Sequence, residues 1–255
     1  MFFTIDHADF SHAHMKPENQ DCFIWLEGKY GGGIGDQHAV LCTAFDGVSR
    51  NHGGQAIRIA APIMGHTMGE IVTMALFDED SSSALESALV SALYKVNLAL
   101  REDPELPVTT CTIFLAIGNQ VIVANSGDSP CYVFSGGTLH SLFECHNAAG
   151  DSVLAGKMRE EEAVCSDLQN KLTGALGGGR TIPRVHTVTF SLNGDTLILL
   201  GSDGAFANFT KDEIIELIRD YQWYPLEQVL DRNIQAAGLR TNDNQTLVLW
   251  RVDVE

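Results

Sequence analysis

Short apolar segments bounded by turn residues recur along the whole chain, and this recurrence constrains the fold more than any other feature. Each segment is rich in Val, Ile, Thr or aromatic residues and is flanked by Gly, Asp or Asn, which is the pattern of a β-strand. Gly118–Asn119 separates two of them and the SGDS sequence at 126–129 separates two more, which predicts a meander of antiparallel hairpins. The predicted strands are 22–28, 39–45, 110–118, 120–127, 130–137, 196–202 and 245–252.

Helical signals lie between these strands. Residues 53–76 and 82–101 carry apolar side chains at three- and four-residue spacing, and Pro62 predicts a kink or a break in the first of these helices. The sequence Thr210–Glu213 is a capping box that opens a third helix, and a fourth is predicted over 225–237. Strands, a helical pair, more strands and then further helices before a last strand predict an α+β fold built on antiparallel sheet.

Composition excludes some classes of partner. The chain has 33 acidic and 16 basic residues and a net charge of −17, which argues against nucleic acid and against an anionic membrane surface. No apolar run approaches eighteen residues, so we expect no membrane span. The amino terminus lacks the pattern of a secretory signal and none of the six cysteines forms a C-x-x-C pair, so we expect a reducing, cytoplasmic location. We predict one domain over 1–255, with the Gly-rich, charged residues 144–180 as an excursion from it.

Three aspartates occupy the ends of predicted strands. Asp46 ends the segment AVLCTAFDG, Asp203 ends TLILLGSDG, and Asp243 directly precedes a third strand in TNDNQTLVLW. Carboxylates that cluster repel one another unless a cation or protons intervene, and Mg²⁺ and Mn²⁺ are the natural cations for oxygen ligands. Asp-Gly is also a common turn dipeptide after a strand. Spacing alone therefore leaves both a metal site and ordinary turns open.

Further polar residues add candidates without deciding between these two interpretations. Asp21 and Asp128 lie beside predicted strands, where solvated turns explain them as well as metal binding does. Three of the nine histidines, His7, His12 and His14, cluster near the start, and a polar terminal segment accounts for them equally. The chain contains no H-E-x-x-H pattern, no G-x-S-x-G elbow and no Walker loop, so a zinc protease, a serine hydrolase of that type and a P-loop enzyme are unsupported.

Seven short motifs occur in order along nearly the whole chain, and each is weak alone. They are KPENQD (16–21), FDGVSRNHGG (45–54), TTCT (109–112), ANSGDS (124–129), LTGALG (172–177), GSDG (201–204) and DNQT (243–246). In this order and at this spacing they resemble the metal-dependent Ser/Thr protein phosphatases of the PP2C (PPM) family, in their compact bacterial form.

The resemblance implies a fold and an activity. The family fold is a four-layer α-β-β-α sandwich of two antiparallel sheets flanked by helices, and 144–180 corresponds to the family's flap, which shapes substrate access. The implied enzyme is a protein serine/threonine phosphatase that hydrolyses phosphoserine and phosphothreonine by attack of a metal-bridging hydroxide. The resemblance implies two Mn²⁺ or Mg²⁺ ions with room for a third. The implied partners are a phosphorylated protein substrate and a cognate Ser/Thr kinase.

The same resemblance implies roles for individual residues. By motif position, Asp46 bridges both metals and the carbonyl of Gly47 binds one of them. Asp203 and Asp243 bind the other metal, and Asp21 acts at the centre, directly or through water. Asp128 and Asp203 match the acidic residues around a third, weaker metal in the family. The predicted metal ligands are thus Asp21, Asp46, Gly47, Asp128, Asp203 and Asp243, and the predicted catalytic residues are Asp46, Asp21 and Lys16.

The chain also departs from the family pattern. Lys16 replaces the usual arginine that grips the phosphate, and lysine offers a point charge instead of a bidentate fork. Val48 stands where some relatives have a histidine that donates a proton to the leaving group, so His52 and Arg50 are candidates for a substitute donor and a substitute phosphate contact. These departures keep two alternatives open. One is a catalytically weak phosphoprotein-binding module of the same fold, and the other is a phosphatase of small phosphoesters.

Overall fold

The computed structural model describes residues 3–31, 36–77, 82–192, 194–206 and 209–254. The strands are β1 (Phe3–His12), β2 (Asp21–Gly31), β3 (Asp36–Asp46), β4 (Val108–Thr109), β5 (Cys111–Ile117), β6 (Gln120–Ser126), β7 (Cys131–Ser135), β8 (Thr138–Ser141), β9 (Leu176–Gly177), β10 (His186–Ser191), β11 (Thr196–Gly201) and β12 (Gln245–Val254). The helices are α1 (Gly53–Phe77), α2 (Ser82–Glu102), α3 (Ala148–Leu154), α4 (Glu160–Ala163), α5 (Asp203–Phe206), α6 (Lys211–Ile218) and α7 (Leu226–Gly238), with 3₁₀ turns η1 (Ser49–Asn51) and η2 (Asp167–Asn170).

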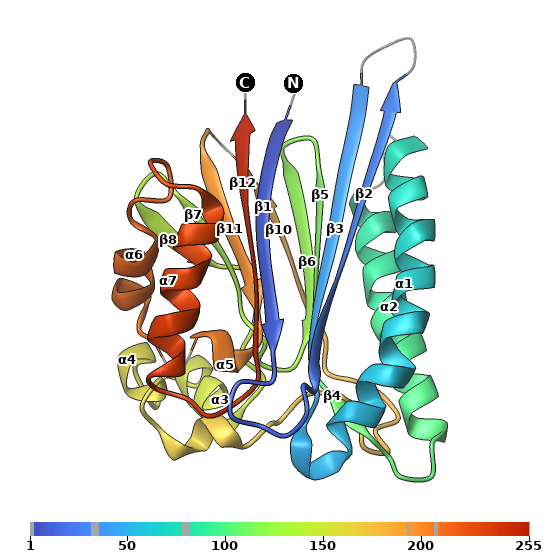
Figure 1. The fold of residues 1–255 in the computed structure, drawn as a ribbon. Helices are drawn as coiled ribbons and strands as arrows, with labels where there is room; N and C mark the ends of the chain where they lie inside the picture. The colour runs from blue at the N-terminus through green and yellow to red at the C-terminus, as the bar shows by residue number, and fades with distance from the viewer. Residues whose placement is uncertain (1–2, 32–35, 78–81, 193, 207–208, 255) are drawn as a thin grey trace.

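Two five-stranded sheets face each other, and helices cover the outer face of each (Figure 1). One sheet has the strand order β10-β6-β5-β3-β2 and the other β1-β12-β11-β7-β8, and their neighbouring strands pair antiparallel. The first sheet is covered by α1 and α2, and the second by α6 and α7 (Figure 1). This arrangement confirms the predicted α-β-β-α sandwich.

The helical pair α1 and α2 covers its sheet because each helix carries an apolar stripe. Ala60, Met64 and Met68 of α1 are fully buried in the same core as Leu41 of β3. The break predicted at Pro62 is not observed, since α1 runs on as one helix to Phe77. Pro62 lies on the exposed side, where water can reach the carbonyl that a proline leaves unpaired. By length and composition α1 could also cross a membrane, but packing against the sheet explains its apolar stripe.

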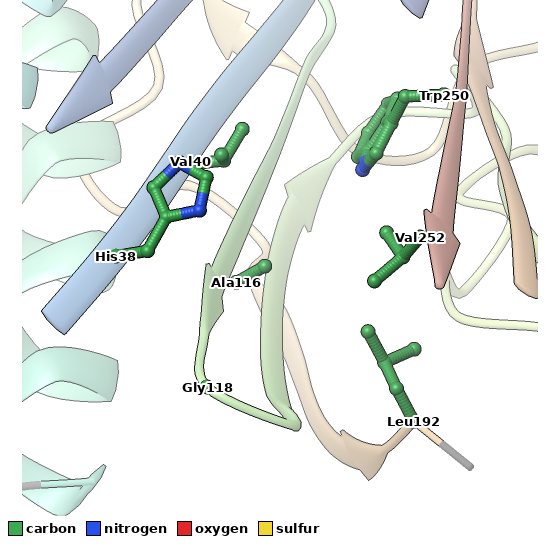
Figure 2. A pocket seen from close by; sticks show the side chains of 7 residues that line it. All are labelled: His38, Val40, Ala116, Gly118, Leu192, Trp250 and Val252. Carbon is green, nitrogen blue, oxygen red and sulfur yellow. The ribbon is translucent and has the colours of Figure 1, made fainter. Parts of the chain in front are cut away.

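The inner faces of the sheets meet in a layer centred on an aromatic cluster. Trp250 of β12 is fully buried, and Trp25 and Phe114 of the opposite sheet contact it edge-on, with ring centroids 5.4 and 4.7 Å away. Figure 2 shows side chains that line a cavity between the sheets, among them Trp250, His38 and Leu192. The volume of this cavity is about 10 Å³. Such a cavity holds no more than about one water molecule. The inter-sheet core is therefore tightly packed and sets the distance between the sheets.

The polar segment near the amino terminus is a strand that the sequence analysis does not predict. β1 pairs with β12 along its whole length, from Phe3 opposite Val254 to His12 opposite Gln245. It is an edge strand, and edge strands commonly carry charged and polar residues that discourage pairing with other chains. The predicted capping box is confirmed, because the Thr210–Glu213 sequence caps α6 with both reciprocal hydrogen bonds.

Residues 144–180 leave the second sheet after β8 and contain α3, α4, η2 and β9. Arg184, just before β10, ties this excursion down. Its guanidinium donates to Asp151 Oδ1 and to Glu144 Oε1, both at 2.6 Å, and to Thr173 Oγ1 at 3.1 Å. The pairing holds α3 and the segment after η2 to the edge of the first sheet.

We expect the Arg184→Met substitution to loosen this excursion. The variant leaves the partly buried Glu144 and Asp151 without their cation, which should lower the free energy of unfolding by about 1–3 kcal/mol. Hydrogen exchange should show faster exchange of the amides of 148–175. The matched control is Arg159→Met, whose partner Glu162 is exposed, so this variant should unfold much like the wild type. Equal amide protection in both variants would contradict the anchoring role.

Candidate metal centre and active site

Aspartates from both sheets meet at one end of the sandwich. Asp21 is the first residue of β2 and Asp46 the last of β3, and the two are direct partners in the antiparallel register. Asp203 begins α5 just after β11, and Asp243 lies just before β12, the strand that pairs with β11. Asp128 lies in the turn between β6 and β7. The structure thus brings the sequence-predicted carboxylates to one edge.

Burial and neighbouring charges raise the pKa of most of these carboxyl groups. Burial raises the pKa of Asp21 to about 7, and the nearby charges of Asp203 and Asp243 add to that rise. Burial and then the charges of Asp203 and Asp21 raise the pKa of Asp46 well above its usual range. The Asp46 and Asp203 carboxyl groups also lie within hydrogen-bonding reach of each other, so their negative charges repel strongly. A cation would relieve the same repulsion.

Asn244 holds the two sheets together at this end. Its Oδ1 accepts a hydrogen bond from the backbone N–H of Gln20 at 3.0 Å, and its Nδ2 donates to the carbonyls of Ala13 and Glu18, each at 3.0 Å. The loop between β1 and β2 is thereby tied to the start of β12. Asn244 belongs to one of the seven motifs, but its role could not be predicted from the sequence because its partners are more than 200 residues away.

Backbone contacts place the other two aspartates. The Ser202 N–H donates to the carbonyl of Thr246 at 2.9 Å, and the Thr246 N–H donates to Ser202 Oγ at 3.1 Å. The chain also passes very close to itself here, since a Cβ on Gly204 would lie 1.9 Å from the carbonyl oxygen of Asn244. Only glycine fits such an approach. Asp203 and Asp243 are therefore fixed side by side by the backbone on which they sit.

Glycine is required beside Asp46 for the same reason. A Cβ on Gly47 would lie 2.5 Å from the carbonyl oxygen of Gln20 and 2.7 Å from the backbone of Gly53. The Gly47 N–H donates to that same Gln20 carbonyl at 2.8 Å. The close contact between the end of β3, the loop before β2 and the start of α1 holds the Asp46-Gly47 backbone in place.

Asp128 is positioned by the excursion that follows β8. Asn147, the N-cap of α3, donates from Nδ2 to Asp128 Oδ2 at 2.9 Å. The neighbouring His146 is fully buried, and its Nδ1 accepts the N–H of Gly127 at 3.1 Å. Burial and then the charge of Asp203 raise the pKa of Asp128 to about 7. Neither Asn147 nor His146 lies in a family motif, so the sequence carried no signal for either.

Lys16 lies beside these acids. Its Nζ is 3.2 Å from Asp243 Oδ1. Burial raises the pKa of Asp203, and the positive charge of Lys16 opposes part of that rise. The two residues considered as a substitute phosphate contact and a substitute proton donor both lie on the surface. Arg50 is exposed, and His52 pairs with Glu105 at 3.3 Å. This pairing favours a solvated loop histidine over a proton donor.

The donor chemistry fits a divalent ion that prefers oxygen. Asp21 is 5% exposed, and its Oδ2 is a buried acceptor that lacks a hydrogen-bond partner in the structure. A buried carboxylate oxygen without a partner is costly unless a cation or a proton satisfies it. Within the described ranges, no three His, Cys, Asp or Glu side chains are grouped closely enough to hold an ion as they stand. The ligand assignment therefore stays a prediction.

Comparison with known proteins identifies the class. The sequence profile of the protein phosphatase 2C family matches residues 10–240, so the chain belongs to this family. The relative named "Serine/threonine phosphatase stp" from Listeria monocytogenes serotype 4b is 28% identical over 231 residues, which cover 82% of this chain and 89% of the relative. The resemblance seen in the sequence is confirmed: this is a protein serine/threonine phosphatase of the PP2C (PPM) family, whose activity depends on metal.

Solved structures share the fold. The serine/threonine phosphatase of S. agalactiae superposes with a TM-score of 0.74 at 21% identity and covers 100% of both chains. The catalytic domain of the phosphatase PstP was solved in complex with two manganese ions. It superposes with a TM-score of 0.71 at 22% identity and covers 99% of this chain and 100% of that one. At such identities these likenesses establish the architecture.

Asp21→Asn should stabilise the metal-free protein at alkaline pH. The pKa of Asp21 is about 7 in the folded protein and near 3.8 in the unfolded chain. Ionisation of this carboxyl group therefore destabilises the folded protein increasingly as the pH rises from 4 to 7, and to the full extent above pH 7. In chelator at pH 8, the free energy of unfolding should exceed that of the wild type by about 1–4 kcal/mol, and the difference should shrink at pH 5. Urea titrations at both pH values measure it, with the exposed Asp231→Asn as the control. A destabilised Asp21→Asn protein at pH 8 would show that the acids do not repel one another as described.

Proposed function

We propose that Asp21, Asp46, Asp203 and Asp243 form the metal centre of this phosphatase and that Lys16 holds the phosphoryl group of a phosphoserine or phosphothreonine substrate. The observation that carries the proposal is the convergence of these acids beside one lysine at a single end of the sandwich, where burial raises the pKa of Asp21, Asp46 and Asp203. When bound, two Mn²⁺ or Mg²⁺ ions activate a water molecule for in-line attack and neutralise the phosphoryl oxygens.

The chain's own residues supply the ligands for these ions. Asp46 has neighbouring acids on two sides, Asp21 across the register and Asp203 within hydrogen-bonding reach, so it is the residue best placed to be shared between two ions. The carbonyl of Gly47 and the carboxylate of Asp243 complete the predicted ligand set. Asp128, tethered by Asn147, is the further acid available for a third ion.

Lys16 supplies the positive charge that a phosphoryl dianion needs. It pairs with Asp243 in this structure, and its side chain is 35% exposed, so a phosphoryl group arriving from solvent can reach its ammonium group. Lysine provides charge without bidentate geometry, so orientation of the phosphoryl group falls mainly to the metal centre.

We further propose the biological setting. The natural substrate is a phosphorylated protein, and a cognate Ser/Thr kinase is the expected counterpart because the phosphatase removes what such a kinase adds. All six cysteines are free, which fits a reducing cytoplasm. We treat residues 1–255 as one domain, with 144–180 as the flap beside the site.

Asp46→Asn should abolish turnover while the protein stays folded. Removing the charge of Asp46 should lower kcat for p-nitrophenyl phosphate by about a hundredfold or more across a Mn²⁺ titration. The attack of water on phosphorus and the neutralisation of the phosphoryl oxygens both depend on the metal ions that this carboxylate would hold. Asp231→Asn, on the exposed face of α7, should match the wild type. Circular dichroism checks the fold of each variant. Retained activity in Asp46→Asn would remove this residue from the site, and an inactive but folded wild type would favour the binding-module alternative.

Lys16→Arg should lower the KM for a phosphopeptide, since a guanidinium can hold two phosphoryl oxygens at once. Lys16→Met should raise the KM by about tenfold, because the charge is lost while the side-chain stem remains. Initial rates at saturating Mn²⁺ measure both. A higher KM for the arginine variant than for the wild type would show that Lys16 is fitted to a different contact.

A further inference from the structure

A groove of about 500 Å³ lies outside the metal centre, on the helix-covered face of the second sheet. It runs between the end of β1, the start of β12 and the C-terminal end of α7, which Figure 1 shows at the same end of the molecule as α5. Its apolar lining comes from Phe10, Ile234 and Leu239. Leu239 is 90% exposed, so a large apolar side chain faces solvent at the rim.

A buried polar group in the groove lacks a partner. Gln245, the first residue of β12, is only 2% exposed, and its Nε2 has no hydrogen-bond acceptor in the structure. A buried amide donor left unpaired costs free energy that an incoming acceptor recovers. Nearby, His12 Nδ1 accepts the backbone N–H of His14 at 2.9 Å, so a neutral His12 ring carries its proton on Nε2 as a second donor. The groove therefore combines apolar surface with hydrogen-bond donors.

The groove adjoins the site proposed for the phosphoryl group. His14 precedes Lys16 by two residues, and its Nε2 hydrogen-bonds the carbonyl of Thr241 at 3.0 Å. Gln245 follows Asp243 by two residues, which is about 7 Å of extended chain. A polypeptide with its phosphoryl group at Lys16 would therefore reach the groove with a residue about two positions away in the sequence.

We propose that this groove binds the polypeptide of a phosphoprotein substrate beside the phosphorylated residue and selects an apolar side chain there. The apolar side chain packs against Phe10, Ile234 and Leu239. A main-chain carbonyl of the same segment accepts a hydrogen bond from Gln245 Nε2. This inference rests on the proposed function, because it uses Lys16 as the point where the phosphoryl group is held.

Gly238, at the end of α7, allows a methyl group to be added inside the groove, with a small shift of the His14 ring. A Cβ added there would lie 3.3 Å from His14 Cε1 and 3.8 Å from Gln245 Nε2, within the groove. Its φ is not in the left-handed region, and alanine favours a helix over glycine by about 1 kcal/mol. Gly65→Ala is the matched control, since Gly65 also lies in a helix and an added Cβ there meets nothing within 4 Å.

The experiment compares three phosphothreonine peptides that carry Leu, Gly or Asp two positions from the phosphorylated residue, tested on each side in turn. On one side, the wild type and Gly65→Ala should favour Leu over Asp by about tenfold in kcat/KM, the effect expected of a small apolar subsite. Gly238→Ala should lose most of that preference through a higher KM for the Leu peptide. Equal kcat/KM for the three peptides on both sides, or a full preference in Gly238→Ala, would overturn the proposal.

Hydrolysis of p-nitrophenyl phosphate by the wild type separates the two ways in which the account can fail. Mn²⁺-dependent turnover of that small ester without discrimination among the peptides would leave the proposed function standing and remove the groove from substrate selection. No turnover of the ester or of any peptide, from folded protein with Mn²⁺, would refute the proposed function and this inference with it.

Discussion

Mutual repulsion among carboxylates is the constraint around which this structure is organised. Asp21, Asp46, Asp203 and Asp243 come from two different sheets. Burial raises the pKa of Asp21 and of Asp46, and the charges of neighbouring aspartates add to both rises. Such an arrangement opposes folding wherever the acids are ionised, and the rest of the molecule must compensate for it. The inter-sheet core around Trp250 and the two outer cores supply that compensation through the burial of apolar surface.

The groups that hold these acids in place are the backbone and the side-chain amide of Asn244, and both are uncharged. Asn244 ties the loop carrying Lys16 to the start of β12, and glycines at 47 and 204 let main chains approach where no side chain fits. Neutral supports of this kind fix charged groups without adding to the repulsion. They leave the carboxylate oxygens, such as Asp21 Oδ2, available for a cation.

Much of the architecture could be predicted because its elements carry local signals. Every predicted strand and helix has a counterpart in the structure, and the capping box at Thr210 is present. The edge strand β1 could not be predicted, since its polar residues are explained only by its pairing with β12. The break considered at Pro62 does not occur, because the exposed side of α1 tolerates a proline.

The candidate site likewise contains residues that the sequence reveals and residues that it does not. Its five aspartates and Lys16 are visible in short motifs, whereas the supports of Asp128 are not. Asn147 and His146 act across the fold from residues outside any motif, and the groove at Gln245 exists only once α7 and β1 flank β12. Contacts between residues far apart in the chain are what the sequence alone could not reveal.

The most direct test is anomalous diffraction at the manganese edge from crystals of the wild-type protein equilibrated with Mn²⁺. We expect two strong peaks bounded by the carboxylates of Asp46, Asp203 and Asp243, with the Asp46 carboxylate in contact with both. Manganese bound elsewhere on the protein, with no peak among these three carboxylates, would contradict it.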